Sequence, residues 1–161
     1  MRNILIPIDG TKQDEAAVRA VAASKRQGAN GVAIHLLNVQ PPVRSYAAQF
    51  LGLAAIRDYQ RVEAGKALAG ARRALDEAGM PFTVHIRIGE SVETIAAAAA
   101  ETAADEIVIA GGGDTLVGDL MRRLLVARLV RRSKVPVVVV RSQRPDGGRA
   151  IPAAGLRPST G

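Results

Sequence analysis

Hydrophobic positions in this chain fall into two alternating patterns, short apolar runs and longer segments with helical spacing. The short runs end in residues that suit turns, as is typical of buried strands in a parallel sheet. They predict five strands: Asn3–Ile8, Val32–Val39, Phe82–Ile88, Glu106–Ala110 and Val135–Val140. The longer segments predict four helices: Thr11–Gln27, Leu53–Ala78, Ser91 to about Ala103, and Asp119–Arg132. This alternation predicts an α/β fold, an open parallel sheet with helices on both faces.

Some of the predicted helices also have polar or glycine residues at their ends that are typical of caps. Asp119 precedes an apolar repeat that begins at Leu120, so we predict that Asp119 is the N-cap of the last helix. Ser91 and Thr94 give a partial capping pattern at the start of the helix before it. Gly28 is a stop signal for the first helix.

The ends of two predicted strands have the composition of a ligand site. Asp9 and Gly10 follow the first strand, and Gly111 to Gly113 with Asp114 follow the fourth. In an open α/β sheet, ligands bind beyond the carboxyl ends of strands whose connections leave in opposite directions. A carboxylate at one strand end and three glycines at another are suited to a phosphate or nucleotide pocket.

The composition of this chain excludes several classes of protein. Its 161 residues are enough for one domain with a substantial core, and the absence of cysteine excludes disulfides and thiolate metal sites. The longest apolar stretch, from Ile95 to Ala104, is mostly alanine and too short to cross a bilayer. The chain enters a strand almost at once, so we expect no signal peptide. We therefore expect a soluble cytoplasmic protein with no membrane contact.

The net charge of +7 is concentrated near the carboxyl end. From Arg122 to Arg157 there are ten Lys and Arg but one acid, Asp146. Such a segment attracts nucleic acid or an acidic partner, but the chain has only two Tyr, two Phe and no Trp for base stacking. A solvated helix face followed by a basic tail is the favoured interpretation, and nucleic acid is not favoured as a partner. Residues 142–161 are rich in Gly and Pro, which predicts a disordered tail after a domain of residues 1–141.

Other chemistry finds little support in the sequence. His35 and His85 lie in predicted strands with no carboxylate or second histidine at ligand spacing, so we predict no metal site. Ser24, Ser45 and Ser91 lack a base and an orienting acid, so we predict no nucleophilic catalysis and no enzyme.

Five segments together carry a family resemblance over residues 1–141. They are Ile4–Thr11, Leu36–Pro41, Ile88-Gly89, Ile107–Gly111 and Arg128–Val140. Their order and spacing resemble the universal stress protein family. The resemblance implies a Rossmann-like five-stranded parallel sheet with strand order 3-2-1-4-5. It also implies a homodimer that pairs the last strand, Val135–Val140, with its symmetry mate, which would protect an open sheet edge.

The resemblance also implies where ATP or AMP would bind. Asp9, after Pro7 and Ile8, matches the aspartate of the first loop, and Val39 matches the residue whose backbone holds adenine. After Ala110, Gly111 matches the first glycine of a motif of the form Gly, two residues, Gly, nine residues, Gly, Ser or Thr. The second glycine falls at Asp114, or at Gly113 if one residue is missing from the loop.

The final Gly-Ser/Thr pair of that motif is absent. Arg123, Leu124 and Leu125 stand at the expected place, and leucine offers neither a hydroxyl nor close backbone approach to a phosphate. The helical period continues through these positions, so we predict one unbroken helix in place of the phosphate turn. Asp114 and Asp119 also place negative charge near the expected phosphates, although Arg122 and Arg123 are able to reach phosphates from the side.

The sequence therefore favours a non-catalytic regulatory domain, homodimeric, with a degenerate adenine-nucleotide site and unidentified protein partners. One alternative is an ATP or AMP sensor with at most slow ATP hydrolysis. Another is a basic module that docks nucleic acid through Arg122–Arg141. The role of Asp9 stays open at this point, because a carboxylate there caps the turn at Gly10-Thr11 or contacts a ligand. A flavin or nicotinamide enzyme is disfavoured because no Gly-x-Gly-x-x-Gly run is present.

Overall fold

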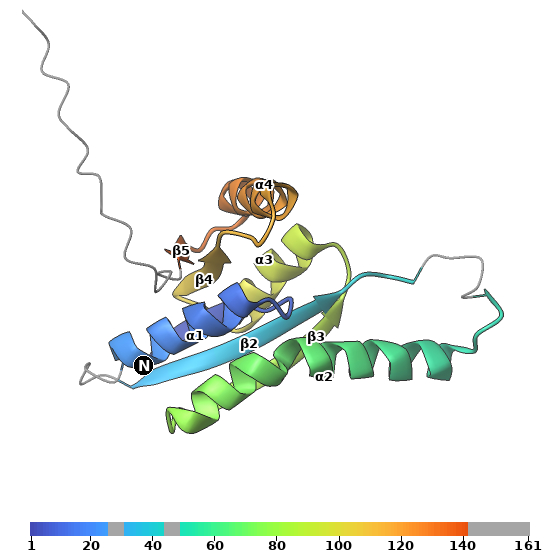
Figure 1. The fold of residues 1–161 in the computed structure, drawn as a ribbon, viewed down its shortest axis with the longest axis horizontal. Helices are drawn as coiled ribbons and strands as arrows, with labels where there is room; N and C mark the ends of the chain where they lie inside the picture. Colours follow the sequence, from blue (N-terminus) through green and yellow to red (C-terminus); the bar gives the residue numbers. More distant parts are fainter. Residues whose placement is uncertain (26–30, 44–48, 142–161) are drawn as a thin grey trace, which may run out of the picture.

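Five parallel strands form the centre of the molecule in the order β3-β2-β1-β4-β5 (Figure 1). The structure is a computed structural model that describes residues 1–25, 31–43 and 49–141. The strands are β1 (Arg2–Pro7), β2 (Val32–Gln40), β3 (Phe82–Ile88), β4 (Glu106–Gly111) and β5 (Val137–Arg141). The helices are α1 (Lys12–Lys25), α2 (Leu53–Glu77), α3 (Ser91–Glu101) and α4 (Leu116–Arg132). The predicted fold class, sheet order and alternation are confirmed.

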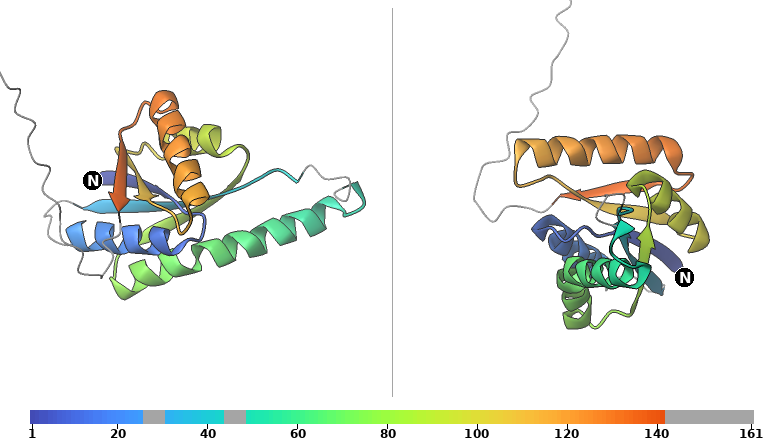
Figure 2. Two further views of the ribbon diagram at one scale, coloured as in Figure 1. Left: turned by 45° about the horizontal axis from the view of Figure 1, so that its top comes forward. Right: turned by 90° about the vertical axis from the view of Figure 1, so that its right-hand side faces the viewer.

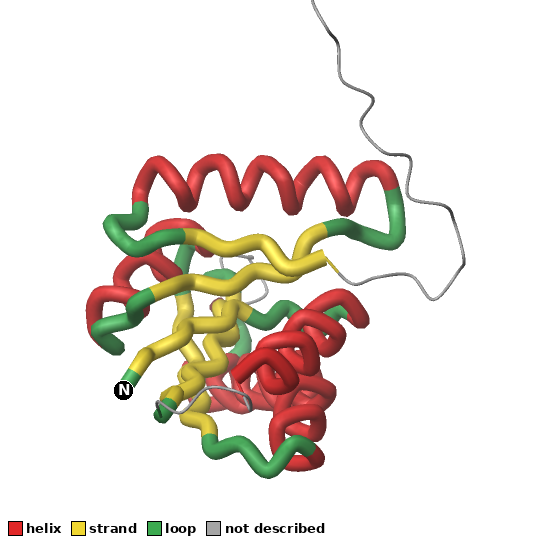
Figure 3. The backbone as a smooth tube through the Cα atoms, turned by 90° about the vertical axis from the view of Figure 1, so that its left-hand side faces the viewer, coloured by secondary structure: helices red, strands yellow, loops and turns green. Residues whose placement is uncertain are grey.

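The helices cover both faces of the sheet, with α1 and α2 on one side and α3 and α4 on the other (Figures 2 and 3). Successive residues of β1 divide between the two cores, as the two-residue period of a strand requires. Ile4 and Ile6 pack with Val18 of α1, whereas Leu5 packs with Leu129 of α4. A strand that buries both faces has to be apolar throughout, which explains the uninterrupted run in β1.

The connections after β1 and β4 leave the sheet in opposite directions. The chain passes from β1 through α1 to β2, and from β4 through α4 to β5, on the other face and toward the other edge. β1 and β4 are themselves neighbours, with Leu5 opposite Ile107. The carboxyl ends of these two strands therefore form the switch point at which open α/β sheets bind ligands.

Several predicted boundaries are corrected by the structure. The last helix begins at Leu116, and its N-cap is Thr115, whose hydroxyl accepts a hydrogen bond from the Gly118 N–H at 3.0 Å. The Asp119 carboxylate instead pairs with Arg123 one turn later, at 2.9 Å. Ser91 is the first residue of α3 and makes no cap, because Glu90 occupies the N-cap position without a side-chain bond.

The structure also corrects the start of the last strand, and some predicted features lie outside the described residues. The last strand begins at Val137 and not at Val135. The predicted stop at Gly28, residues 44–48 and the predicted tail at 142–161 lie outside the described residues. Within the described ranges, no helix combines the length and the apolarity that a bilayer crossing needs.

Candidate functional site

The turn after β1 is shaped by Asp14, in the first turn of α1. One oxygen of this carboxylate, Oδ2, accepts hydrogen bonds from the backbone N–H groups of Asp9, Gly10 and Thr11 at 2.8, 3.1 and 3.3 Å. Gly10 has φ +96°, and a Cβ there would lie 3.0 Å from the Ala67 backbone of α2. Glycine is therefore needed for both the conformation and the close approach of α2.

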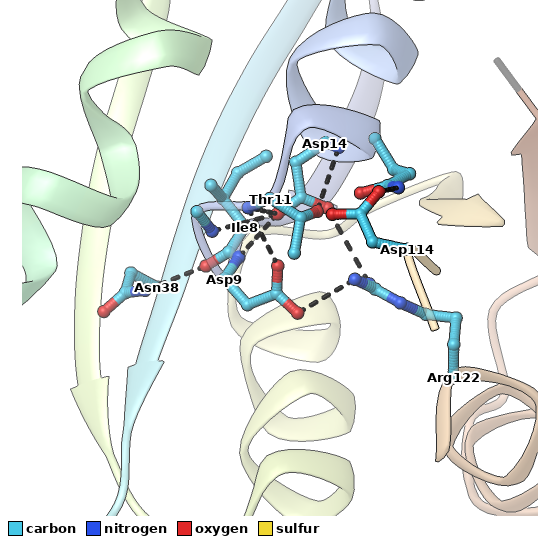
Figure 4. A network of polar contacts seen from close by, with 9 residues as sticks. Ile8, Asp9, Thr11, Asp14, Asn38, Asp114 and Arg122 are labelled. Carbon is cyan, nitrogen blue, oxygen red and sulfur yellow. Dashed lines mark hydrogen bonds and ion pairs between the residues drawn. The ribbon is translucent and has the colours of Figure 1, made fainter. Parts of the chain in front are cut away.

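The Asp9 side chain lies between this turn and Arg122 of α4 (Figure 4). Its Oδ1 accepts a long hydrogen bond from the Thr11 N–H at 3.3 Å, and its Oδ2 accepts one from Arg122 at 2.9 Å. The Asp9 side chain is 58% exposed, whereas Asp14 is 2% exposed. Most of the capping of the turn thus belongs to Asp14, and the Asp9 carboxylate, paired with Arg122, lies partly exposed at the surface of the site.

Arg122 lies between the two carboxylates and is almost fully buried. Its side chain is 10% exposed, and its second terminal nitrogen, Nη1, is 3.7 Å from Asp14 Oδ1. That separation is too long for a hydrogen bond. The buried Oδ1 of Asp14 has no hydrogen-bond partner among the described residues. The contact between Arg122 and Asp14 is therefore a loose ion pair.

Asp9, Asp14 and Arg122 lie close together, and the pKa values of the two carboxyl groups shift in opposite directions. Burial raises the pKa of Asp14 to about 7, and the neighbouring Asp9 carboxyl raises it further. The Asp9 N–H and Arg122 lower it, but by less. Burial also raises the pKa of Asp9, but interactions with the Asp14 carboxyl, Arg122 and Thr11 outweigh it and hold that pKa below its ordinary value. Asp14 is thus the carboxyl that exchanges a proton near neutral pH.

The loop after β4 packs against the start of α4 through its glycines. A Cβ on Gly113 would lie 2.6 Å from the Asp119 backbone nitrogen and 2.7 Å from the Gly118 carbonyl carbon. Gly112 has φ +86°, and a Cβ on Gly111 would lie 2.7 Å from the Val139 side chain of β5. Asp114, which ends the loop, accepts a hydrogen bond from Gln13 of α1 at 2.7 Å.

Two cavities meet at Asp9. The first, of about 590 Å³, lies between the β1 turn, the glycine loop and α4, and it includes Gly112, Gly113, Asp114, Arg122 and Arg128 in its lining. The second, of about 680 Å³, lies beyond the ends of β1 and β2, and it includes Val39, Gln40, Tyr59 and Lys66. The predicted residues Asp9, Gly113 and Asp114 are thus brought together, and Val39 lines the adjoining space.

The other predicted site residues have supporting places. Pro7 is the last residue of β1, opposite Leu37 of β2. Ile8 is buried in the core, and its backbone carbonyl accepts a hydrogen bond from Asn38 Nδ2 at 2.8 Å. Ala110 is buried in β4, and Gly111 pairs with Arg141 of β5, close to the Val139 side chain. These residues fix the positions of the strand ends but do not line the first cavity.

The α4 helix runs without a break through the positions at which the sequence lacks the phosphate turn. Arg123, Leu124 and Leu125 all lie within it, as predicted from the apolar period. Leu124 and Leu125 line the first cavity, whereas the Arg123 side chain is 66% exposed and pairs with Asp119. No helix N-terminus therefore faces the cavity at these residues.

Sequence reasoning missed two features of the molecule. It did not single out Asp14, although the Asp14 N–H bonds the Thr11 hydroxyl at 3.3 Å in a recognisable N-terminal cap. It also placed no second histidine near His35 or His85, and this is wrong. Nδ1 of His35 and Nε2 of His85 are 3.0 Å apart across β2 and β3. The described residues nevertheless contain no group of three or more metal-ligating side chains.

Several solved structures have a fold similar to that of this chain. A comparison with curated proteins finds no match. Among solved structures, a universal stress protein from Lactobacillus plantarum is 19% identical with a TM-score of 0.67, over 87% of this chain and 97% of that one. One from Archaeoglobus fulgidus in complex with dAMP is 20% identical with a TM-score of 0.63, over 86% and 97%. An Arabidopsis thaliana family protein with AMP bound is 14% identical with a TM-score of 0.63, over 89% and 93%.

The family assignment rests on the sequence match, which agrees with these folds. The sequence pattern of the Universal stress protein family matches residues 1–141, nearly the whole chain. Those residues include both strand ends of the site, the glycine loop and all of α4. This chain belongs to the universal stress protein family.

Proposed function

We propose that the protein is a non-catalytic regulatory domain whose altered nucleotide site takes an adenine nucleoside with a single phosphate. Relatives of the same fold were crystallised with dAMP and with AMP. Here the two cavities that meet at Asp9 offer adjoining spaces for a nucleoside beside Val39 and for a phosphate beside Gly112 and Gly113.

The observation that carries this proposal is the unbroken α4 helix across Arg123 to Leu125. A triphosphate needs several backbone N–H groups at a helix N-terminus, and a continuous helix uses its N–H groups internally. Leu124 and Leu125 line the cavity where further phosphates would extend, and they provide no hydrogen-bond donor. The first turns of α3 and α4 still line the cavity at Ser91 and Gly118, but the N–H groups that a phosphate turn at Arg123 to Leu125 would supply are absent, so the site is suited to a single phosphate.

Calorimetric titration with AMP, ATP and adenosine tests the proposal. We expect AMP to bind, ATP to bind no tighter than AMP, and no release of phosphate from ATP. ATP that binds at least tenfold tighter than AMP would support the alternative of an ATP sensor instead. Absence of binding by all three compounds, in protein shown to carry no co-purified nucleotide, would overturn nucleotide binding altogether.

We also propose a homodimer formed through β5. This strand lies at the edge of the sheet, and its residues Val138 and Val139 are 39% and 42% exposed. An exposed β-branched edge strand is open to unwanted pairing, and a symmetric partner covers it. Such a dimer would present the two nucleotide sites to regulatory protein partners.

Docking of nucleic acid finds less support in the described residues. Arg122, Arg123 and Arg132 of α4 are engaged with Asp9, Asp119 and Glu93. The first half of α4 is also largely apolar at its surface, with exposed Leu116, Val117, Leu120, Met121 and Leu124. A phosphate backbone is attracted by free cations, and three of the seven Lys and Arg from Arg122 to Arg141 are held in ion pairs among the described residues.

A further inference from the structure

The charge balance of the site poses a problem for any phosphate. With both carboxyl groups ionised, Asp9, Asp14 and Arg122 carry a net charge of −1, and in the lining of the first cavity Glu90 and Asp114 outnumber Arg128. A phosphate dianion placed among them would be repelled. Binding is therefore favoured if the site loses negative charge or redirects its buried cation Arg122.

Arg122 is positioned to be redirected. Arg122 lines the cavity, and the contact of its guanidinium with Asp14 at 3.7 Å is too long for a hydrogen bond. A guanidinium offers five N–H donors in a planar fork that matches a phosphate in two-point contact. Exchange of the loose Asp14 contact for a phosphate would sacrifice no formed hydrogen bond.

Asp14 is positioned to lose its charge when Arg122 turns away. Its Oδ2 keeps the three backbone N–H bonds in either protonation state, and its buried Oδ1, which has no hydrogen-bond partner among the described residues, faces Arg122. Once the guanidinium is withdrawn, an ionised Oδ1 would be buried without a countercharge. A proton on Oδ1 removes that charge and leaves the turn intact. Burial already raises the pKa of Asp14 to about 7, so the proton is readily available.

We propose that a phosphate monoester binds this site together with one proton: Arg122 turns from Asp14 to the phosphate, and Asp14 becomes protonated at Oδ1. This inference rests on the proposed function, whose site it deepens. The proton comes from solvent, and no covalent bond changes. Binding of the phosphate is therefore strongest at pH values at which Asp14 is already protonated.

The other charged groups around the site are few, and several of them are paired. Glu63 and Lys66 of α2 pair with each other at 2.8 Å, and Glu93 of α3 pairs with Arg132. Asp9 is held by Arg122, and Asp119 of α4 pairs with Arg123. The remaining charged residues of the cavity lining are Glu90, Asp114 and Arg128. The described lining contains no histidine, so Asp14 is the protein group to which we assign a proton taken up near neutral pH, and the Asp14→Asn variant separates it from a proton on the phosphate itself.

Calorimetric titration in two buffers that differ in ionisation enthalpy measures the protons taken up per ligand bound. At about pH 8 the phosphate of AMP is already a dianion, since its second pKa is about 6. We expect AMP to take up between about half a proton and one proton, and adenosine to take up none. The affinity for AMP should fall up to about tenfold from pH 7 to pH 8.

Asp14→Asn mimics the protonated acid, because its amide oxygen still accepts the three N–H bonds. We expect this variant to bind AMP at about pH 8 at least as tightly as the parent, without proton uptake and with little pH dependence. Asp119→Asn, which changes an α4 carboxylate paired with Arg123, is the matched control and should take up as many protons as the parent.

Each outcome decides between the two proposals. Binding of AMP without proton uptake in the parent would overturn this inference and leave the proposed function standing. Failure of both AMP and adenosine to bind would overturn the proposed function and this inference with it. If Asp14→Asn does not fold, carboxyl-carbon NMR of the parent replaces it. The midpoint of Asp14 must then rise when AMP is added, and an unchanged midpoint overturns the inference.

Discussion

Arg122 Nη2 lies 2.9 Å from Asp9 Oδ2, and this ion pair joins α4 to the end of β1 across the candidate site. Residues on opposite faces of the sheet thus meet at the switch point between the two central strands. The same guanidinium is the only cation among the described residues that bridges both Asp9 and Asp14. We therefore expect the site to be sensitive to changes at Arg122, whose side chain contacts both carboxylates.

Arg122→Gln should weaken the binding of AMP by about tenfold to a hundredfold. A hydrogen bond between charged groups contributes about 1.5–3 kcal/mol, and about 1.4 kcal/mol corresponds to tenfold in affinity. The binding of adenosine, which has no phosphate, should change little. Calorimetric titration measures both.

Arg123→Gln is the control for that variant, because the neighbouring Arg123 side chain is 66% exposed and pairs within α4 with Asp119. We expect it to leave the affinity for AMP within about twofold, since an exposed pair contributes little. An equal loss in both variants would show that the general positive charge of α4 is responsible and not the placement of Arg122.

Asp14→Asn should change how stability depends on pH. The pKa of Asp14 rises from 3.8 to about 7 on folding, so the folded chain holds more protons than the unfolded chain between these values. The contribution of Asp14 to the free energy of unfolding therefore falls as pH rises through this window, by at most about 4 kcal/mol, at about 1.36 kcal/mol for each unit of the shift.

Urea unfolding of the parent and Asp14→Asn at a series of pH values measures this effect. The variant should gain stability relative to the parent as pH rises from about 4 to 8, because only the parent loses a proton from a buried group. The pKa of Asp9 is lowered, so its contribution changes only in more acidic solution. Parallel curves for the two proteins would contradict the assignment of Asp14.

Gly113→Ala should destabilise the fold by about 1–3 kcal/mol, the usual result of overpacking. Its Cβ would meet backbone atoms of Gly118 and Asp119 at 2.7 and 2.6 Å, and backbone yields less readily than a side chain. Gly65→Ala in α2 is the control, because no atom lies within 4 Å of a Cβ there. That change should stabilise the protein by up to about 1 kcal/mol through helix propensity. Equal unfolding midpoints for the two variants would contradict the close packing of the glycine loop.

Val138→Lys should convert the proposed dimer into a monomer, because a charged residue on an edge strand opposes pairing. Light scattering coupled to size exclusion measures the mass, and circular dichroism checks that the fold is kept. Val62→Lys on α2 is the control, since Val62 is exposed on a helix that packs on the other half of the sheet. A parent protein that is already monomeric would refute the dimer, and dissociation by both variants would place the interface elsewhere.

The strands and the unbroken last helix were predictable because buried positions have to be occupied by apolar residues, which form a regular pattern in the sequence. β1 and β4 bury both faces, so their runs are apolar throughout. The spacing of Leu125 and Leu129, which pack toward the core, continued through the positions of the missing phosphate turn. Asp9 and the glycine loop were predictable because strand ends of a parallel sheet share one edge.

The first turn of α4 was not predictable from apolar periodicity. Leu116 and Val117 are exposed, so no core imposes a pattern on them, and Thr115 and Asp119 are both suitable N-caps. Asp14 resembles any acidic residue in a first helical turn, where the helix dipole favours negative charge. Its burial depends on the sharp turn at Gly10 and on the cover by Arg122, which only the assembled structure shows. The pairing of His35 with His85 likewise depends on the register between β2 and β3.

The separation of Asp9 and Arg122 along the chain, 113 positions, also has a consequence for folding. β1 is able to pair with β2 as soon as the first third of the chain is available, whereas its pairing with β4 closes a loop of about a hundred residues. Long-range contacts of this kind form slowly and late, because loop closure has to precede the gain from packing. During synthesis the candidate site can consequently be completed only after α4 has emerged from the ribosome, so an incomplete chain lacks the Arg122 side of the site.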